Sequence, residues 1–224
     1  MRKILFIICW ALAGVGLYSC SLDEPSYGKT TSDNYYQKES DIEQALTGAY
    51  LQLRTTWNEY ALNHYFVGDC STDDALKGGG NDGDRAEVRD LSDFTIYTTN
   101  GEVGRRWEIL YRLINRCNDV IYYAPDAIGN EELLKRYANE AKALRAFGYY
   151  CLVTTFGEVP LITTPMQPAE ILQIPRSPLE KVYECIVNDL TDASALPAKG
   201  DYSEDDAYRA TRGFAASKEK RASA

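Results

Sequence analysis

Three aspartates lie close together in the segment 68–74, Gly-Asp-Cys-Ser-Thr-Asp-Asp. Asp69, Asp73 and Asp74 would place carboxylates beside the hydroxyls of their two neighbours, Ser71 and Thr72. Such oxygens could accept hydrogen bonds from sugar hydroxyls, or hold Ca²⁺, which prefers oxygen ligands. A solvated turn with a helix cap is the alternative interpretation, and it requires no ligand.

A second acidic segment follows in the glycine-rich run 78–84, which contains Asp82 and Asp84. These carboxylates could take a cation, but their spacing does not match an EF-hand loop. The run is not a phosphate-binding loop either, because no Gly-Lys-Ser/Thr follows it. We therefore interpret the run as a flexible loop, and we predict no cofactor apart from the calcium considered above.

An aromatic group precedes the aspartates and consists of Trp57, Tyr60, His64, Tyr65 and Phe66. Flat aromatic faces stack on the apolar faces of pyranose rings, so an exposed set of rings would form a platform for sugars. The alternative is that these rings pack in the core at the end of a helix, as most large aromatic side chains do.

The residue types offer little for catalysis. His64 is the only histidine, and no serine or cysteine beside it has the setting of a nucleophile. Acidic residues are numerous, yet no spacing singles out a pair of the kind that glycosidases use. We predict a protein that is not an enzyme and has no catalytic residues.

The N-terminus has the pattern of an export signal. Arg2 and Lys3 precede an apolar run, Ile4–Leu17, and Leu17-Tyr18-Ser19 leads to Cys20. The run is shorter than the ~20 residues that span a membrane, and its end resembles a bacterial lipobox. This predicts a lipoprotein signal peptide over 1–19 and lipid attachment at Cys20. An ordinary secretory signal cut nearby is the alternative.

The charge limits the possible partners. The net charge is −9 at pH 7, and residues 1–19 contribute only Arg2 and Lys3, so the rest of the chain is still more acidic. Nucleic-acid binding needs clustered lysine and arginine, which argues against that class of ligand. Electrostatic docking on anionic lipid is disfavoured for the same reason, so membrane attachment would depend on the lipid anchor.

Helical spacing of apolar residues recurs along most of the chain. The expected helices cover 41–56, about 102–124, 131–155 and about 177–196, with Gly157 as a left-handed residue after the third. The segment 57–103 is expected to be irregular, and Leu91–Thr98 to be extended or a short strand. The pattern predicts an all-α fold.

Two residue types within these helices call for partners or burial. Arg145 interrupts a nearly apolar stretch, and a buried arginine needs partners, for which Glu140 or Asp119 could serve. The cysteines past the lipobox have no metal or redox spacing and are expected to be small core residues, with a disulfide left open. These are Cys70, Cys117, Cys151 and Cys185.

Several segments, taken in order, resemble the N-terminal part of the RagB/SusD family. The strongest are Glu140–Tyr150 (EAKALRAFGYY) and Phe156–Leu161 (FGEVPL). Ala45–Tyr50, the stretch from Trp107 to Asn118, and Arg209–Gly213 continue the resemblance, which covers about residues 20–213. Gly148 departs from it, because a larger aromatic residue is more usual at this position.

The resemblance implies tetratricopeptide-like helix pairs with long irregular loops. It divides the chain into a tether and linker over 20–39 and a SusD-like N-terminal helical domain over 40–213. Residues 214–224 have no apolar face, so we expect a disordered or aberrant tail there. Family members are about double this length, and we interpret the chain as truncated.

The function implied is that of a lipid-anchored protein on the surface of the outer membrane. It would capture oligosaccharides, or sometimes peptides, without catalysis and deliver them to a SusC-like TonB-dependent transporter. The alternative is a helical-repeat scaffold lipoprotein for outer-membrane assembly, with no small ligand. The candidate ligand-binding residues are Trp57, Tyr60, His64, Tyr65, Asp69, Asp73 and Asp74.

Overall fold

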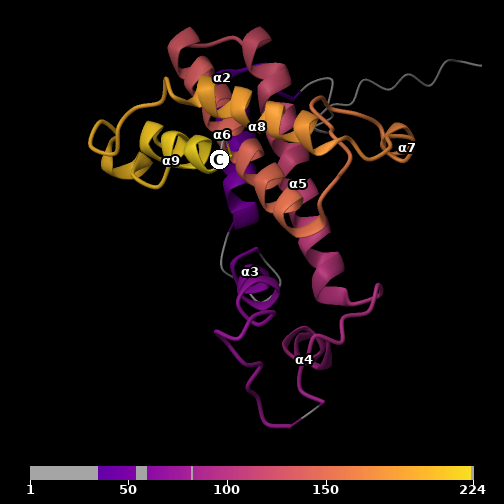
Figure 1. The fold of residues 1–224 in the computed structure, drawn as a ribbon. Coiled ribbons are helices and arrows are strands. Elements are labelled where there is room, and N and C mark those ends of the chain that lie inside the picture. Colours follow the sequence, from indigo (N-terminus) through magenta and orange to yellow (C-terminus); the bar gives the residue numbers. More distant parts are fainter. Residues whose placement is uncertain (1–34, 54–59, 82, 223–224) are drawn as a thin grey trace, which may run out of the picture. The chain divides into compact units, whose positions relative to one another are not determined.

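The computed structural model describes residues 35–53, 60–81 and 83–222 (Figure 1). The predictions about Cys20, the signal peptide and Trp57 lie outside these residues. Within them the structure contains helices and two isolated β-bridges but no strand, which confirms the all-α prediction. The elements are α2 (Glu39–Tyr50), η1 (Leu51–Leu53), α3 (Tyr60–Gly68), α4 (Ala86–Ser92), α5 (Gly101–Tyr123), η2 (Ala124–Asp126), α6 (Glu131–Phe156), α7 (Pro168–Ile171), α8 (Leu179–Ala193), η3 (Glu204–Asp206) and α9 (Arg212–Ala222).

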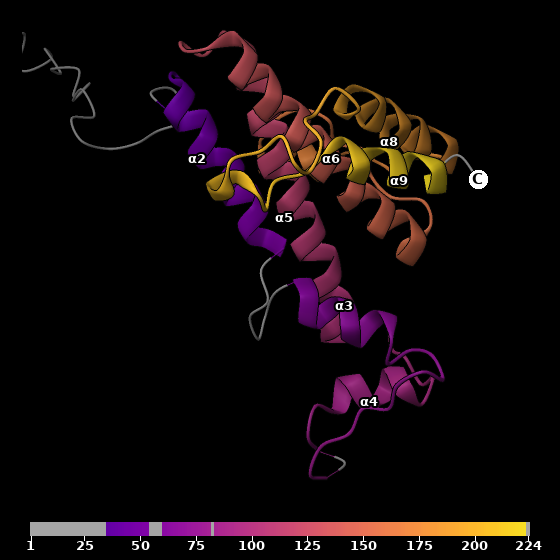
Figure 2. The ribbon, with the colours of Figure 1, turned by 90° about the vertical axis from the view of Figure 1, so that its left-hand side faces the viewer.

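The three long helices α5, α6 and α8 form the centre of the fold. α6 packs against both α5 and α8, α2 lies against α5 and α6, and α9 lies against α8 (Figure 2). One core contains Leu110, Ile114, Leu152, Ile186 and Leu190, and a second contains Ile42, Leu46, Leu113, Val120 and Leu144.

Side-chain caps set where the two longest helices begin. Asn100 accepts hydrogen bonds from the N–H groups of Glu102 and Val103, at 3.1 and 3.2 Å, and so starts α5. Asn130 does the same for α6. These bonds satisfy amides that a helix N-terminus otherwise leaves without partners. α6 ends at Phe156, and Gly157 follows with φ +70° and ψ −129°. The positive φ favours glycine here, but the ψ differs from that of the left-handed helical conformation predicted for this residue.

Gly148 of α6 packs tightly against α5. A Cβ atom built at this position would lie 3.0 Å from Cγ1 of Ile114 and 3.5 Å from Cδ2 of Leu113. Ile114 is almost fully buried and belongs to a core packed at the density usual for protein interiors. The larger aromatic residue that the family resemblance favours therefore has no space in this chain.

The expectation of an irregular segment over 57–103 is wrong for a large part of it. α3 and α4 lie in this segment, and Phe66, Cys70, Val88 and Leu91 form a small buried core between them. Leu91 is still within α4, and the described residues up to Thr98 form no strand. Each helix is short, and glycines separate them, so hydrophobic periodicity over a longer window does not detect them.

The disordered tail expected over 214–224 also needs correction. Residues 212–222 form α9, in which Ala215 is buried and Phe214 packs against the main core. The Nζ of Lys218 lies 4.9 Å from the centroid of the Phe147 ring. Phe214, Ala215 and Ala222 pack against the main core, and Lys218 also lies over the Tyr150 ring of α6. These contacts hold α9 on α6 and α8 although the helix has no continuous apolar stripe.

The partners of Arg145 differ from those expected. Its guanidinium pairs with Asp189 of α8 and donates to Asn118 Oδ1 at 2.9 Å and to the carbonyl of Thr163 at 2.9 Å. Neither Glu140 nor Asp119 is its partner. Glu140 pairs with Arg209 and Arg136, and Asp119 accepts a hydrogen bond from Tyr36.

The extended chain after α6 is held by side chains from the helices. Tyr111 donates to the carbonyl of Pro160 at 2.7 Å, and Asn118 donates to the carbonyl of Ile162 at 2.9 Å. The phenol of Tyr149 both donates to the Ile162 carbonyl and accepts from the Ile162 N–H, each at 2.7 Å. The backbone groups of this segment thus find partners without a sheet.

The four described cysteines are free thiols. Cys70, Cys117 and Cys151 are buried, as predicted for small core residues, and Cys185 is partly buried. Burial raises the pKa of Cys185 to about 11, so this thiol is protonated and unreactive at neutral pH.

Candidate functional site

α3 and the turn after it carry most of the candidate binding residues. Tyr65 lies on α3 with 43% of its surface exposed, and Asp69 follows the helix and is exposed. The Asp69 N–H donates to the carbonyl of Tyr65 at 2.8 Å, which continues the helix by one turn. The structure therefore brings the phenol and the carboxylate to adjacent positions.

The turn itself is built from local hydrogen bonds. Thr72 Oγ1 donates to the carbonyl of Asp69 at 2.7 Å and accepts from the N–H of Asp74 at 3.2 Å. Asp73 and Asp74 are exposed. This geometry agrees with a solvated turn, and it leaves the carboxylates accessible to a ligand.

His64 makes a contact that positions α3 on α5. Its Nδ1 lies 3.2 Å from Nη1 of Arg106, whose Nε donates to Thr155 Oγ1 at 2.9 Å. Burial, followed by the positive charge of Arg106, lowers the pKa of His64. The imidazole is therefore neutral at pH 7 and accepts from the guanidinium through Nδ1.

Glu102, at the start of α5, connects the two short helices. Asn63 of α3 donates to its carbonyl at 2.8 Å, and Arg85, which precedes α4, pairs with its carboxylate at 3.2 Å. The Arg85 guanidinium also lies 4.6 Å from the centroid of the Phe66 ring. These contacts hold α3 and α4 against the N-terminus of α5, so the surface they carry has a defined shape.

An exposed apolar group follows α4 and is not among the candidates predicted from the sequence. Phe94, Ile96 and Tyr97 are 70%, 49% and 64% exposed. The Asn100 N–H donates to the carbonyl of Tyr97 at 3.0 Å, and the Asn100 amide caps α5, so this stretch is attached at its C-terminal end. The signal in the sequence is the run Phe-Thr-Ile-Tyr, shortly before the capping asparagine; its apolar residues also fit the extended chain or short strand expected there.

The remaining candidates can be placed only in part. Tyr60 begins α3, but its side chain is outside the described set, as is the whole of Trp57. Phe66 is 8% exposed and belongs to the small core between α3 and α4, so it cannot contribute to a platform. Among the residues that the structure describes, no three histidine, cysteine, aspartate or glutamate side chains are grouped so that they could hold a metal ion.

Comparison with known proteins identifies the family. Residues 21–221 match a SusD-like family described as "Starch-binding associating with outer membrane". The chain belongs to the SusD-like (RagB/SusD) family. The match includes the α3–α4 region and all but the last residue of α9.

Two kinds of relative support the assignment. SusD-like protein P2 from Formosa agariphila is 30% identical over 212 residues, which cover 88% of this chain and 40% of that protein. The structure of a laminarin-binding SusD-like protein is 31% identical with a TM-score of 0.71, over 80% of this chain and 38% of the other. Surface glycan-binding protein A from Bacteroides fluxus is 28% identical with a TM-score of 0.70, over 83% of this chain and 39% of that protein.

These comparisons confirm the tetratricopeptide-like helical fold, which the SusD-like structures share. The chain spans about two fifths of the length of the relatives it matches. Within the described ranges, no helix is long and apolar enough to cross a membrane.

Proposed function

We propose that this protein is a lipid-anchored outer-membrane receptor that binds oligosaccharides at the cell surface and delivers them to a SusC-like TonB-dependent transporter. The observation that carries the proposal is the family match across residues 21–221. It is supported by 31% identity to a protein that binds laminarin, at a TM-score of 0.71.

The α3–α4 region supplies the ligand contacts in this chain. Tyr65, Phe94 and Tyr97 expose ring surface, and rigid aromatic side chains give large contact area at a small cost in conformational entropy. Asp69 and the exposed carboxylates of the following turn are acceptors for sugar hydroxyls. The contacts of Glu102 hold this surface in place before the ligand binds, which reduces the entropy lost on binding.

Delivery follows from tethering. A receptor anchored through Cys20 stays close to the transporter, so a captured glycan meets the transporter at a high effective concentration. Binding and release suffice for this role, and no bond in the glycan has to break.

Calorimetric titration with laminarin tests the glycan site. Tyr97→Ala should weaken binding about tenfold, equivalent to ~1.4 kcal/mol, through loss of one stacked ring. Tyr122→Ala is the matched control, because Tyr122 on α5 is similarly exposed, at 56% against 64% for Tyr97. If laminarin does not bind, the titration is repeated with a panel of neutral and acidic polysaccharides. Failure of every glycan in the panel to bind would refute the proposal.

Two further experiments test the calcium prediction and the transporter partner. Repeating the titration after removal of Ca²⁺ with EDTA tests the calcium prediction, since a metal held by the carboxylates of 69–74 would contribute to affinity. Purification of the protein from outer membranes tests the partner, and a TonB-dependent transporter should co-purify with it. Its absence under conditions that preserve other outer-membrane complexes would contradict delivery.

A further inference from the structure

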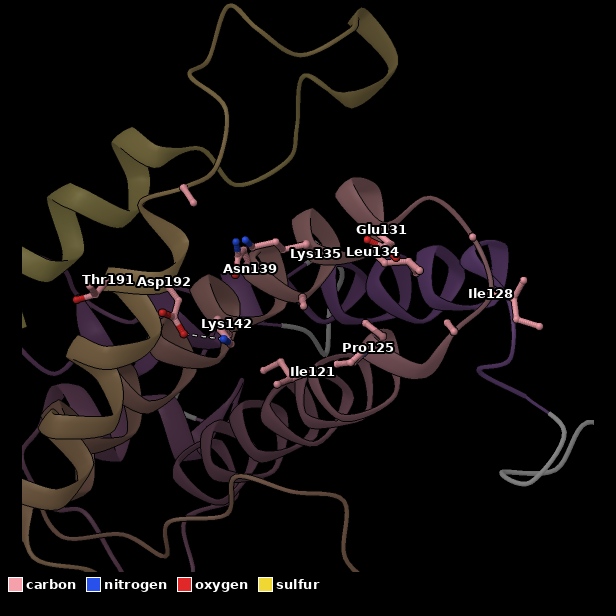
Figure 3. A pocket seen from close by; sticks show the side chains of 15 residues that line it. Ile121, Pro125, Ile128, Glu131, Leu134, Lys135, Asn139, Lys142, Thr191 and Asp192 are labelled. Carbon is pink, nitrogen blue, oxygen red and sulfur yellow. Dashed lines mark hydrogen bonds and ion pairs between the residues drawn. The ribbon is translucent and has the colours of Figure 1, made fainter.

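A cavity of about 800 Å³ lies on a different part of the molecule, between the end of α5, the turn after it, α6 and the end of α8 (Figure 3). Its apolar lining includes Ile121, Pro125 and Leu134, and its polar lining includes Lys135 and Asn139. Cavities that bind ligands in proteins have volumes of ~300–1,000 Å³, so the size is sufficient for a ligand.

Asn139 is the unusual residue of this groove. It is 8% exposed, and its side chain forms no hydrogen bond with any residue that the structure describes. Its amide atoms are not among the fully buried polar atoms without a partner in the described chain. The residue lines the groove, so these atoms are accessible from it. Because these atoms are open to the groove and have no partner among the described residues, the amide can form hydrogen bonds with a ligand that enters the groove.

The chemistry of the lining indicates the class of ligand. A primary amide both donates and accepts, and therefore matches the C=O and N–H of a peptide group. The described residues of the lining include no aromatic ring, so the groove lacks a stacking platform for sugars. Its aliphatic floor suits an apolar side chain instead.

The groove also has a lysine that could bind an acidic group of the ligand. Lys135 lies one turn before Asn139 on α6, is exposed, and forms no ion pair with the described residues. Lys142, one turn after Asn139, is already paired with Asp192 of α8 at 2.6 Å, as the dashed line in Figure 3 shows. A single ammonium group is thus available for a carboxylate of the ligand.

We propose that this groove binds an extended peptide segment. One peptide group of the ligand pairs with the Asn139 amide, an apolar side chain rests on Ile121, Pro125 and Leu134, and an acidic side chain reaches Lys135. This site is separate from the glycan surface on α3 and α4, and it does not depend on the function proposed above.

The experiment uses NMR titration of the full chain with a mixture of blocked pentapeptides that carry leucine at the second position and aspartate at the fourth. The side-chain amide signals of Asn139 are assigned by their absence in Asn139→Ala. These signals should shift on titration, and Asn139→Ala should weaken binding about tenfold. Lys135→Ala should weaken binding of this mixture but not of a second mixture with asparagine in place of aspartate.

Two matched variants control for general effects. Asn188→Ala on α8 and Lys199→Ala remove exposed residues of the same types outside the groove, and binding should be unchanged. Ala195→Leu adds bulk to an exposed residue of the lining and should block binding while the fold is retained.

Stability provides an independent readout. Asn139→Ala should leave the melting temperature nearly unchanged, because the side chain has no hydrogen bond with the described residues to lose. A clearly lower melting temperature would assign Asn139 to folding and overturn the proposal. Unchanged Asn139 signals at millimolar peptide, or shifts produced by laminarin oligosaccharides in place of peptide, would overturn it as well.

Discussion

The guanidinium of Arg145 on α6 donates two hydrogen bonds to the carboxylate of Asp189 on α8, Nε to Oδ2 at 2.8 Å and Nη2 to Oδ1 at 2.7 Å. Only 7% and 6% of the two side chains are exposed. The remaining nitrogen donates to Asn118 of α5 and to the carbonyl of Thr163. One side chain therefore joins three helices and the extended segment.

Removal of Asp189 should destabilise the fold strongly. Asp189→Ala leaves the charge of Arg145 buried without a counter-ion, and such changes cost about 3–5 kcal/mol. Urea unfolding followed by circular dichroism measures the loss. Asp192→Ala is the control on the same helix, because Asp192 pairs with Lys142 but is 54% exposed, and its loss should cost under ~1 kcal/mol. Equal losses for the two variants would contradict this role of Asp189.

Stability should depend on pH through Glu140. Its side chain is fully buried, and its Oε1 has no hydrogen-bond partner among the described residues. Oε2 accepts from the phenol of Tyr50 at 2.9 Å and lies 3.4 Å from the Arg209 guanidinium. Burial is the largest effect and raises the pKa of Glu140 despite Arg209, Tyr50 and Arg136, which lower it.

A raised carboxyl pKa in the folded state favours the protonated form. The contribution of Glu140 to stability is thus fully present below its unfolded pKa of about 4.3 and is lost as pH rises through its folded pKa. The unfolding free energy of the wild type minus that of Glu140→Gln should fall as the pH rises above the unfolded pKa of about 4.3. A difference that rises over this range would show that the arginines outweigh burial.

Gly148 should not tolerate the larger aromatic residue that the family resemblance leads us to expect at this position. Gly148→Phe places its ring against Ile114 and Leu113, and overpacking of this kind costs about 1–3 kcal/mol or more. Combining it with Ile114→Ala should recover part of the loss, because the second change opens space at the same contact. Thermal unfolding of the two single variants and the double variant measures the coupling, and simple additivity would refute the steric explanation.

Membrane attachment should depend on Cys20. Cys20→Ala removes the thiol that would carry the lipid, so the protein should move from the membrane fraction to the soluble fraction. Cys185→Ala, at a free and partly buried thiol, is the control and should remain with the membranes. Continued membrane association of Cys20→Ala in fractionated cells would refute the lipid anchor.

The long helices could be predicted from the sequence because their apolar periodicity is sustained. The helices expected over 131–155 and about 102–124 agree closely with α6 and α5, respectively. The partner of Arg145 could not be predicted, because Asp189 is 44 residues away in the chain and the pairing depends on how α6 packs against α8. Periodicity indicates which face of a helix is buried but not which residue of a neighbouring helix it meets.

The candidate site could be predicted only where its residues are neighbours in the chain. Tyr65 and Asp69 are one helical turn apart, so their proximity follows from the helix. Phe94 and Tyr97 were missed because exposure depends on how α4 and the start of α5 are arranged. Asn139 could not be predicted as a site residue at all, because its lack of a hydrogen-bond partner among the described residues depends on how the whole fold packs.

The extended segment after α6 has a consequence for mutational tolerance. The side chain of Thr163 is exposed, and its carbonyl is what Arg145 binds. Every amino acid has a carbonyl, so most substitutions at residue 163 preserve this contact. Tyr149 differs, because its phenol forms hydrogen bonds with both backbone groups of Ile162, and a substitution that removes the phenol loses both bonds. The path of this segment is therefore encoded largely in the helices that surround it, and its own sequence is free to diverge.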